Sequence, residues 1–111
     1  MKQYIESETL ELKEKYTDII LKEIVSFLNG NGGTIYIGVK YNGEVVGVDK
    51  VDEALRKISD MITTQIEPNP QDEIKSELQF DNTKTIMVIK INKGRKHIYC
   101  QKKYGFSSTG C

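Results

Sequence analysis

Residues 29–48 read NGNGGTIYIGVKYNGEVVGV and contain six glycines, a composition that could cradle a phosphate group. A phosphate-binding loop of the P-loop type follows a strand and precedes a helix, because the helix N-terminus directs free N–H groups at the anion. Here the pattern predicts the reverse order, and no Lys-Ser or Lys-Thr follows the glycines. A helix C-terminus presents carbonyl oxygens, which repel phosphate. We therefore expect Gly30, Gly32 and Gly33 to shape a sharp turn and Gly43 to close a hairpin.

Positive charge near the C-terminus is the second chemical candidate. Residues 82–111 contain no Asp or Glu and seven bases, although the whole chain has 16 residues of each sign. Such a local excess attracts an anionic polymer, and aromatic rings among the bases can stack on nucleobases. The candidate nucleic-acid contacts in this segment are Lys93, Arg95, Lys96, Lys102, Lys103 and Tyr104. Lys13, on the exposed side of the first predicted strand, is a further candidate that could join them. A charged edge hairpin that prevents aggregation would have the same composition, so that interpretation stays open.

Length and composition restrict the class of protein. The 111 residues fit one domain, and 29% charged and 38% hydrophobic residues are typical of a globular protein. No apolar run approaches the roughly 18 residues that span a membrane, and the first residues lack a signal-peptide core. We therefore expect a cytoplasmic protein outside the membrane. Cys100 and Cys111 have no zinc-ligand spacing and form no disulfide framework, so free thiols are expected.

Hydrophobic periodicity predicts the elements that must position these groups. Residues 9–13 alternate, with Leu10 and Leu12 on one side and Glu11 and Lys13 on the other, which is typical of a half-buried strand. Helices are predicted within residues 17–30 and 51–66, and further strands within 33–39, 44–48, 73–80, 84–92 and 97–101. The expected fold is one α+β domain over residues 1–111, with a mixed, mostly antiparallel sheet and two helices packed on it.

Several of these segments together resemble the AlbA-type domain of the Schlafen family. They are ESETLELKE, FLNGNGGTIYIGV, NGEVVGV and a terminal SST, and the resemblance covers about residues 5–109. The ordered combination is specific, although each piece alone is weak. The resemblance implies a DNA-binding domain of the kind found in bacterial and archaeal transcriptional regulators. Family members usually continue beyond the last motif, so we expect this chain to be a fragment of a longer protein.

The resemblance also implies a catalytic alternative. Some animal Schlafen proteins cleave tRNA and ribosomal RNA with three carboxylates, a site that would use Mg²⁺ or Mn²⁺. Glu6 and Glu11 match two of these carboxylates, but the third position looks like Tyr41, which carries no acid. Losing one carboxylate of three weakens a metal site sharply. Glu6 and Glu11 meet only if the chain bends between them, near Ser7, and otherwise Glu11 pairs with Lys13 or with a neighbouring strand.

The sequence therefore predicts a nucleic-acid-binding domain whose partner is DNA or RNA and which needs no cofactor. Two alternatives stay open. One is a metal-dependent RNA endonuclease that uses Glu6 and Glu11, although Tyr41 argues against catalysis. The other is a protein-interaction module that forms a homodimer by pairing a sheet edge with a second copy.

Overall fold

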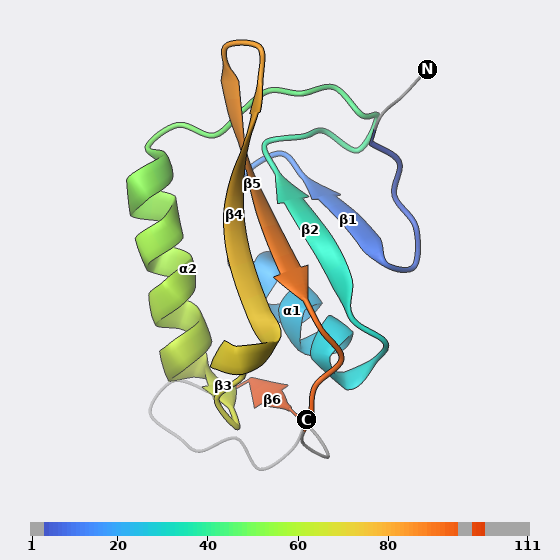
Figure 1. Ribbon diagram of the computed structural model, residues 1–111, viewed down its shortest axis with the longest axis vertical. Helices are drawn as coiled ribbons and strands as arrows, with labels where there is room; N and C mark the ends of the chain where they lie inside the picture. Colours follow the sequence, from blue (N-terminus) through green and yellow to red (C-terminus); the bar gives the residue numbers. More distant parts are fainter. Residues whose placement is uncertain (1–3, 96–98, 102–111) are drawn as a thin grey trace.

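The computed structural model describes residues 4–95 and 99–101. The elements follow in the order β1 (Leu10–Lys13), α1 (Ile19–Asn29), β2 (Gly33–Ile37), α2 (Val51–Gln65), β3 (Ile66–Glu67), the 3₁₀ helix η1 (Gln71–Glu73), β4 (Ile74–Asp81), β5 (Lys84–Ile91) and β6 (Cys100–Gln101). The main sheet has the strand order β1-β2-β5-β4, and β3 pairs with β6 at one end of the molecule (Figure 1). Within these residues, no helix combines the length and apolar character needed to cross a membrane.

The sheet is mixed, as expected. β1 runs parallel to β2, whereas β2 with β5 and β5 with β4 are antiparallel. Both helices pack on one face, so the predicted α+β architecture with a mostly antiparallel sheet is confirmed. The side chains of β5 alternate between the two faces, with Ile86 and Val88 on one side and Met87 and Ile89 on the other.

Each face of the sheet has its own core. The larger core lies between the sheet and the helices, and its members include Ile20, Ile24, Phe27, Leu28, Ile35, Ile37, Ile58, Ile62, Met87 and Ile89. The smaller core lies on the opposite face, where its buried members are Tyr4, Leu12, Val39, Ile86 and Val88. Tyr4 brings the N-terminal segment onto this face through an edge contact with Tyr36, whose ring centroid is 5.1 Å away. The N-terminal segment is thereby held beside β1.

The glycine run forms the predicted turn from α1 into β2. Gly30 ends α1 without a left-handed backbone, and it is Gly32 that has a positive φ of 81°. Gly33 is needed for a different reason, because a Cβ there would clash with Cε1 of the buried Phe27 ring. The turn is therefore set by backbone conformation at one glycine and by close packing at the next.

Two local expectations are wrong. Residues 44–48 do not form a strand; only an isolated bridge joins Val39 and Val45. The physical reason is that Val48 N donates to Thr85 O at 2.8 Å, so the segment leaves β2 and crosses to the start of β5. The free thiol expected at Cys100 is also absent, because Cys100 is disulfide-bonded.

Replacing Gly32 tests the turn. We expect Gly32→Ala to lower the free energy of unfolding by about 1–2 kcal/mol from the left-handed backbone alone. A further loss is expected because the new Cβ would lie 2.7 Å from the Ile91 carbonyl oxygen. Denaturant unfolding measures the change, with Asn31→Ala at the exposed neighbouring position as the control. Equal stability of the two variants would contradict this account of the turn.

Candidate functional site

The chain reverses between Ser7 and Leu10 and so brings Glu6 beside β1. Ser7 N donates to Leu10 O at 3.0 Å, and Leu10 N donates to Ser7 O at 3.4 Å. A Glu6 Oε2 atom then accepts a hydrogen bond from Leu12 N at 3.2 Å. The Glu6 carboxyl group thereby comes close enough to Glu11 to raise the pKa of Glu11. The bend that these two carboxyl groups need in order to meet is therefore present.

Lys13 lies at the centre of this group of charges. Its Nζ is 2.7 Å from Glu23 Oε1 and 3.8 Å from Glu11 Oε2. Glu11 stands opposite Ile35 in the sheet register, so it and Lys13 point toward the helices, and Glu23 of α1 can reach Lys13. We call Glu6, Glu11, Lys13 and Glu23 the carboxylate cluster. Sequence reasoning missed Glu23, because only the packing of α1 beside β1 brings it there.

Crowding within the carboxylate cluster changes proton affinities. Burial raises the pKa of Glu11, and the charges of Glu23 and Glu6 and a hydrogen bond with Glu6 raise it further, against the opposing effect of Lys13. Burial acts to lower the pKa of Lys13, but the hydrogen bond to Glu23 and the surrounding carboxylates leave that pKa above its usual value. Lys13 is therefore charged at neutral pH and neutralises part of the cluster.

These residues do not fit a divalent metal held by three carboxylates. Glu6 directs one oxygen at a backbone N–H, and Glu23 directs one at Lys13, whose ammonium group competes with a cation for the same oxygens. The third family position, Tyr41, is 83% exposed and offers no carboxylate. Among residues 4–95 and 99–101, no group of three or more acidic, His or Cys side chains is arranged to hold a metal ion. No catalytic step follows from this donor set.

The candidate nucleic-acid contacts are divided between two ends of the sheet. Lys13 lies where β1 meets Ile37 of β2, whereas residue 93 follows β5 at the opposite end, beyond the pair of Gly33 with Ile91. Lys13 is also 23% exposed and ion-paired, so it does not join Lys93 in one surface. Four of the candidates, Lys96, Lys102, Lys103 and Tyr104, lie outside the described residues.

Arg95 combines a structural contact with an exposed charge. Its Nε lies 3.3 Å from Oε1 of Glu73, and the Glu73 side chain is only 7% exposed. Glu73 is the one buried charged residue in the described part of the chain. Removing Arg95 would leave that carboxylate unpaired, at a cost in stability. The Arg95 side chain is itself 77% exposed, so its remaining N–H groups stay accessible to a ligand.

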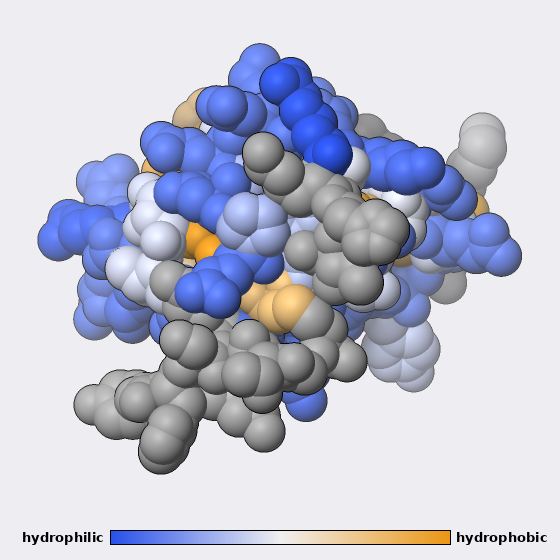
Figure 2. Space-filling view, turned by 90° about the horizontal axis from the view of Figure 1, so that it is seen from below, coloured by the Kyte–Doolittle hydropathy of each residue, from blue (hydrophilic) through white to orange (hydrophobic). Residues whose placement is uncertain are grey.

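The last described segment is fixed beside Lys93 and Arg95. The Asn29 side chain donates to Tyr99 O at 2.8 Å and accepts from Tyr99 N at 2.7 Å. Gly94 N donates to Leu28 O at 2.9 Å, which ties the end of β5 to the same turn of α1. We call the surface of residues 93–95 and 100–101 the basic end. Figure 2 looks at the molecule from below and shows mainly hydrophilic residues around a small apolar area.

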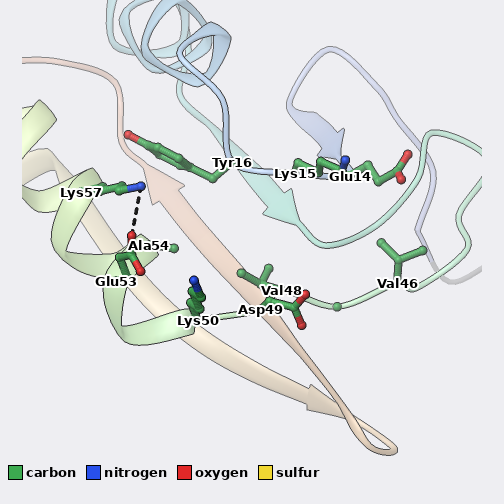
Figure 3. A pocket seen from close by; sticks show the side chains of 11 residues that line it. Glu14, Lys15, Tyr16, Val46, Val48, Asp49, Lys50, Glu53, Ala54 and Lys57 are labelled. Atoms are coloured by element: carbon green, nitrogen blue, oxygen red, sulfur yellow. Dashed lines mark ion pairs between the residues drawn. The ribbon is translucent and has the colours of Figure 1, made fainter.

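A separate pocket of about 420 Å³ lies between the β1–α1 connection and the start of α2 (Figure 3). Tyr16, Val48 and Ala54 supply apolar surface, and the Tyr16 hydroxyl group lies 3.5 Å from the Met61 sulfur. Its charged lining residues are Glu14, Asp49, Glu53, Lys15, Lys50 and Lys57. Because the signs balance, and Lys57 already pairs with Glu53 at 3.3 Å, the pocket has no net attraction for an anionic polymer.

Replacing Glu11 tests the repulsion in the carboxylate cluster. The pKa of Glu11 is raised in the folded protein, so stability falls as pH rises from the ordinary carboxyl pKa through the folded value. We therefore expect Glu11→Gln to be more stable than the wild type at pH 7, with an advantage that shrinks below pH 4. Denaturant unfolding at both pH values measures this.

The exposed Glu8 lies outside the carboxylate cluster and provides a matched control through Glu8→Gln. If Glu11→Gln is instead less stable than the wild type at pH 7, the attraction of Glu11 to Lys13 outweighs the repulsion, and our electrostatic account is wrong.

Comparisons with known proteins agree with the fold. The N-terminal domain of a Nitrosomonas europaea protein, described as related to the ATP-dependent DNA helicase RecG, has a TM-score of 0.67 at 18% identity, over 95% of this chain and 77% of that one. A Corynebacterium diphtheriae protein has a TM-score of 0.60 at 14% identity, over 80% of this chain and 18% of that one. No curated protein matches significantly. The family model described as Schlafen, AlbA_2 matches residues 6–109, so this chain belongs to that family.

Proposed function

We propose that this chain is a nucleic-acid-binding domain, with DNA as the favoured ligand, and that it serves a transcriptional regulator. The observation that carries the proposal is the charge of residues 82–111, which hold seven bases and no acids. Within that segment, Gly94 and Tyr99 are both hydrogen-bonded to the same end of α1, which fixes residues 93–95 and 99–101 beside it. A cluster of cations held on a fixed surface is a phosphate-binding feature.

Lys93 is the most direct candidate for a phosphate contact. It is exposed and forms no ion pair with a described residue, whereas Lys90 is paired with Glu77 at 3.2 Å. Arg95 adds exposed guanidinium N–H groups despite its contact with Glu73. In sequence, Lys96, Lys102 and Lys103 immediately flank the anchored residues, and we propose that they extend the same surface.

The net negative charge of the carboxylate cluster supports the choice of the basic end as the binding surface. It contains three acids and one base, so its field repels phosphate, and we leave Lys13 out of the proposed contacts. Family membership and the RecG-related neighbour are consistent with a nucleic-acid role.

Two lysines, Lys93 just beyond one end of β5 and Lys84 at its other end, give a matched test of binding. Lys93→Ala should weaken binding to a DNA duplex and reduce the slope of log affinity against log salt by about one, because one phosphate contact is lost. Lys84→Ala removes the same charge from the far end of β5 and should leave both quantities close to the wild type. Fluorescence anisotropy over a salt series measures them.

Lys93 is a better choice than Arg95 for this test, since Arg95→Ala would also unpair the buried Glu73. Equal losses in Lys93→Ala and Lys84→Ala would show attraction by overall charge and no defined surface. Absence of wild-type binding at about 50 mM salt would refute the proposal for this domain.

The catalytic alternative gives a separate prediction. Because the position that resembles the third family carboxylate is Tyr41, we expect little or no cleavage of tRNA by the wild type with added Mn²⁺. Gel analysis of the products, with Glu11→Gln assayed beside the wild type, measures this. Strong cleavage that disappears in Glu11→Gln would establish a nuclease and contradict our reading of the cluster.

A further inference from the structure

The outer edges of β1 and β4 differ in how far their backbone groups are hydrogen-bonded by other parts of the chain. On the outer side of β1, Leu10 exchanges backbone hydrogen bonds with Ser7, and the N–H of Leu12 is bound by the Glu6 carboxylate. The edge of β1 is therefore largely satisfied by the chain's own N-terminal segment, and little of it is left to pair with another strand.

The edge of β4 has no such cover within the described residues. β4 is eight residues long and is hydrogen-bonded to β5 on one side only. No backbone hydrogen bond from another described segment reaches it on the outer side. In Figure 1 the hairpin of β4 and β5 extends past the neighbouring elements. A long strand with one unpaired edge is a template for a further strand.

β4 is also amphipathic, and its apolar side is not covered. Leu78 and Phe80 lie on the same side of the strand as Ile74, yet they are 38% and 74% exposed. Ser76, between Ile74 and Leu78, is exposed as well, so the described residues do not bury this part of β4. The other side carries Lys75, Glu77, Gln79 and Asp81. Exposed apolar side chains along an unpaired edge favour a partner strand at this position.

We propose that β4 pairs with β4 of a second copy of this chain, antiparallel and centred on Leu78, which joins the two four-stranded sheets into one. In this register Leu78 lies opposite Leu78 of the second copy, and Phe80 lies opposite Ser76. Lys75 then faces Asp81 of the second copy, and the two-fold symmetry repeats that pair. Opposite charges directly across a ladder stabilise it, and paired apolar side chains remove exposed surface from water.

The charges of β4 select this register over its neighbours. Alternative registers have their centre a whole number of residues from Leu78, because only then do the same faces of the two strands stay together. Centring on Glu77 places two Glu77 carboxylates opposite each other, and centring on Gln79 places Glu77 opposite Asp81. Centring on Ser76 pairs Lys75 with Glu77 but leaves Phe80 beyond the ladder. The Leu78 register pairs Lys75 with Asp81 at both ends of the ladder, places no like charges opposite each other, and keeps Phe80 within the ladder.

Two charge reversals test the proposal by sedimentation equilibrium over a concentration series. The wild type should show a monomer–dimer equilibrium. Lys75→Asp and Asp81→Lys should each weaken the dimer by about tenfold or more, because each places like charges opposite one another twice. An equimolar mixture of the two variants should restore dimerisation, since both cross-strand pairs are then of opposite sign. Lys22→Asp, on an exposed position of α1, is the control reversal.

Circular dichroism of each variant verifies folding, because Lys75→Asp also removes the ion pair of Lys75 with Glu77 at 3.3 Å. A wild type that stays monomeric up to about 1 mM, a range in which even weak pairs associate, would overturn the proposal and leave β4 as an edge for a different protein. A dimer that both reversals leave intact would place the interface elsewhere. A dimer that the reversals weaken but the mixture does not restore would refute the Leu78 register.

Discussion

The antiparallel pairing of β2 with β5 determines which side chains enter each core and where the charged groups lie. These are the two central strands, and their side chains are buried on both faces of the sheet. The pair of Ile35 with Ile89 belongs to the helix-side core, while Val88 belongs to the smaller core opposite. A shift of register by one residue would exchange the side chains of the two cores, because successive side chains of a strand point to opposite faces. Full burial of each such apolar side chain contributes about 1.5–3 kcal/mol to the free energy of unfolding, so that shift would be strongly disfavoured.

This register also decides which charged groups meet. Gly33 pairs with Ile91, so the glycine turn lies at the end of the sheet that carries Lys93. Lys13 is paired with Ile37, several residues along the sheet, where Glu23 of α1 neutralises it. The carboxylate cluster and the basic end are thus separated by the length of a strand. The phosphate ligand that we propose for the basic end would therefore lie the length of a strand away from the carboxylates.

Much of the fold could be predicted from local pattern, because periodicity reports directly which side chains face the core. The helix predicted within residues 17–30 has apolar residues at helical spacing, Ile20, Ile24, Phe27 and Leu28, and all four are buried in α1. The contacts that sequence could not supply depend on packing between distant segments. Glu23 reaches Lys13, and Arg95 reaches Glu73, without any local spacing that would predict either pair.

From the sequence, the carboxylate cluster could be predicted only in part and on one condition. The meeting of Glu6 with Glu11 required a bend near Ser7, and the sequence could name the bend without establishing it. The structure supplies the bend through the hydrogen bonds of Ser7 with Leu10. Lys13 was expected on an exposed side of its strand, and its pairing with Glu23 could not be foreseen because it depends on where α1 packs.

The proposed function requires that nucleic acid binds at the basic end and not at the carboxylate cluster. Titration of the ¹⁵N-labelled chain with a short DNA duplex, followed by backbone amide chemical shifts, measures both surfaces in one experiment. We expect the largest shift changes at residues 93–95 and 99–101 and in the adjoining turn of residues 29–32, with small changes at Glu11 and Lys13. The largest changes at Glu11 and Lys13, or no change at about 50 mM salt, would contradict it.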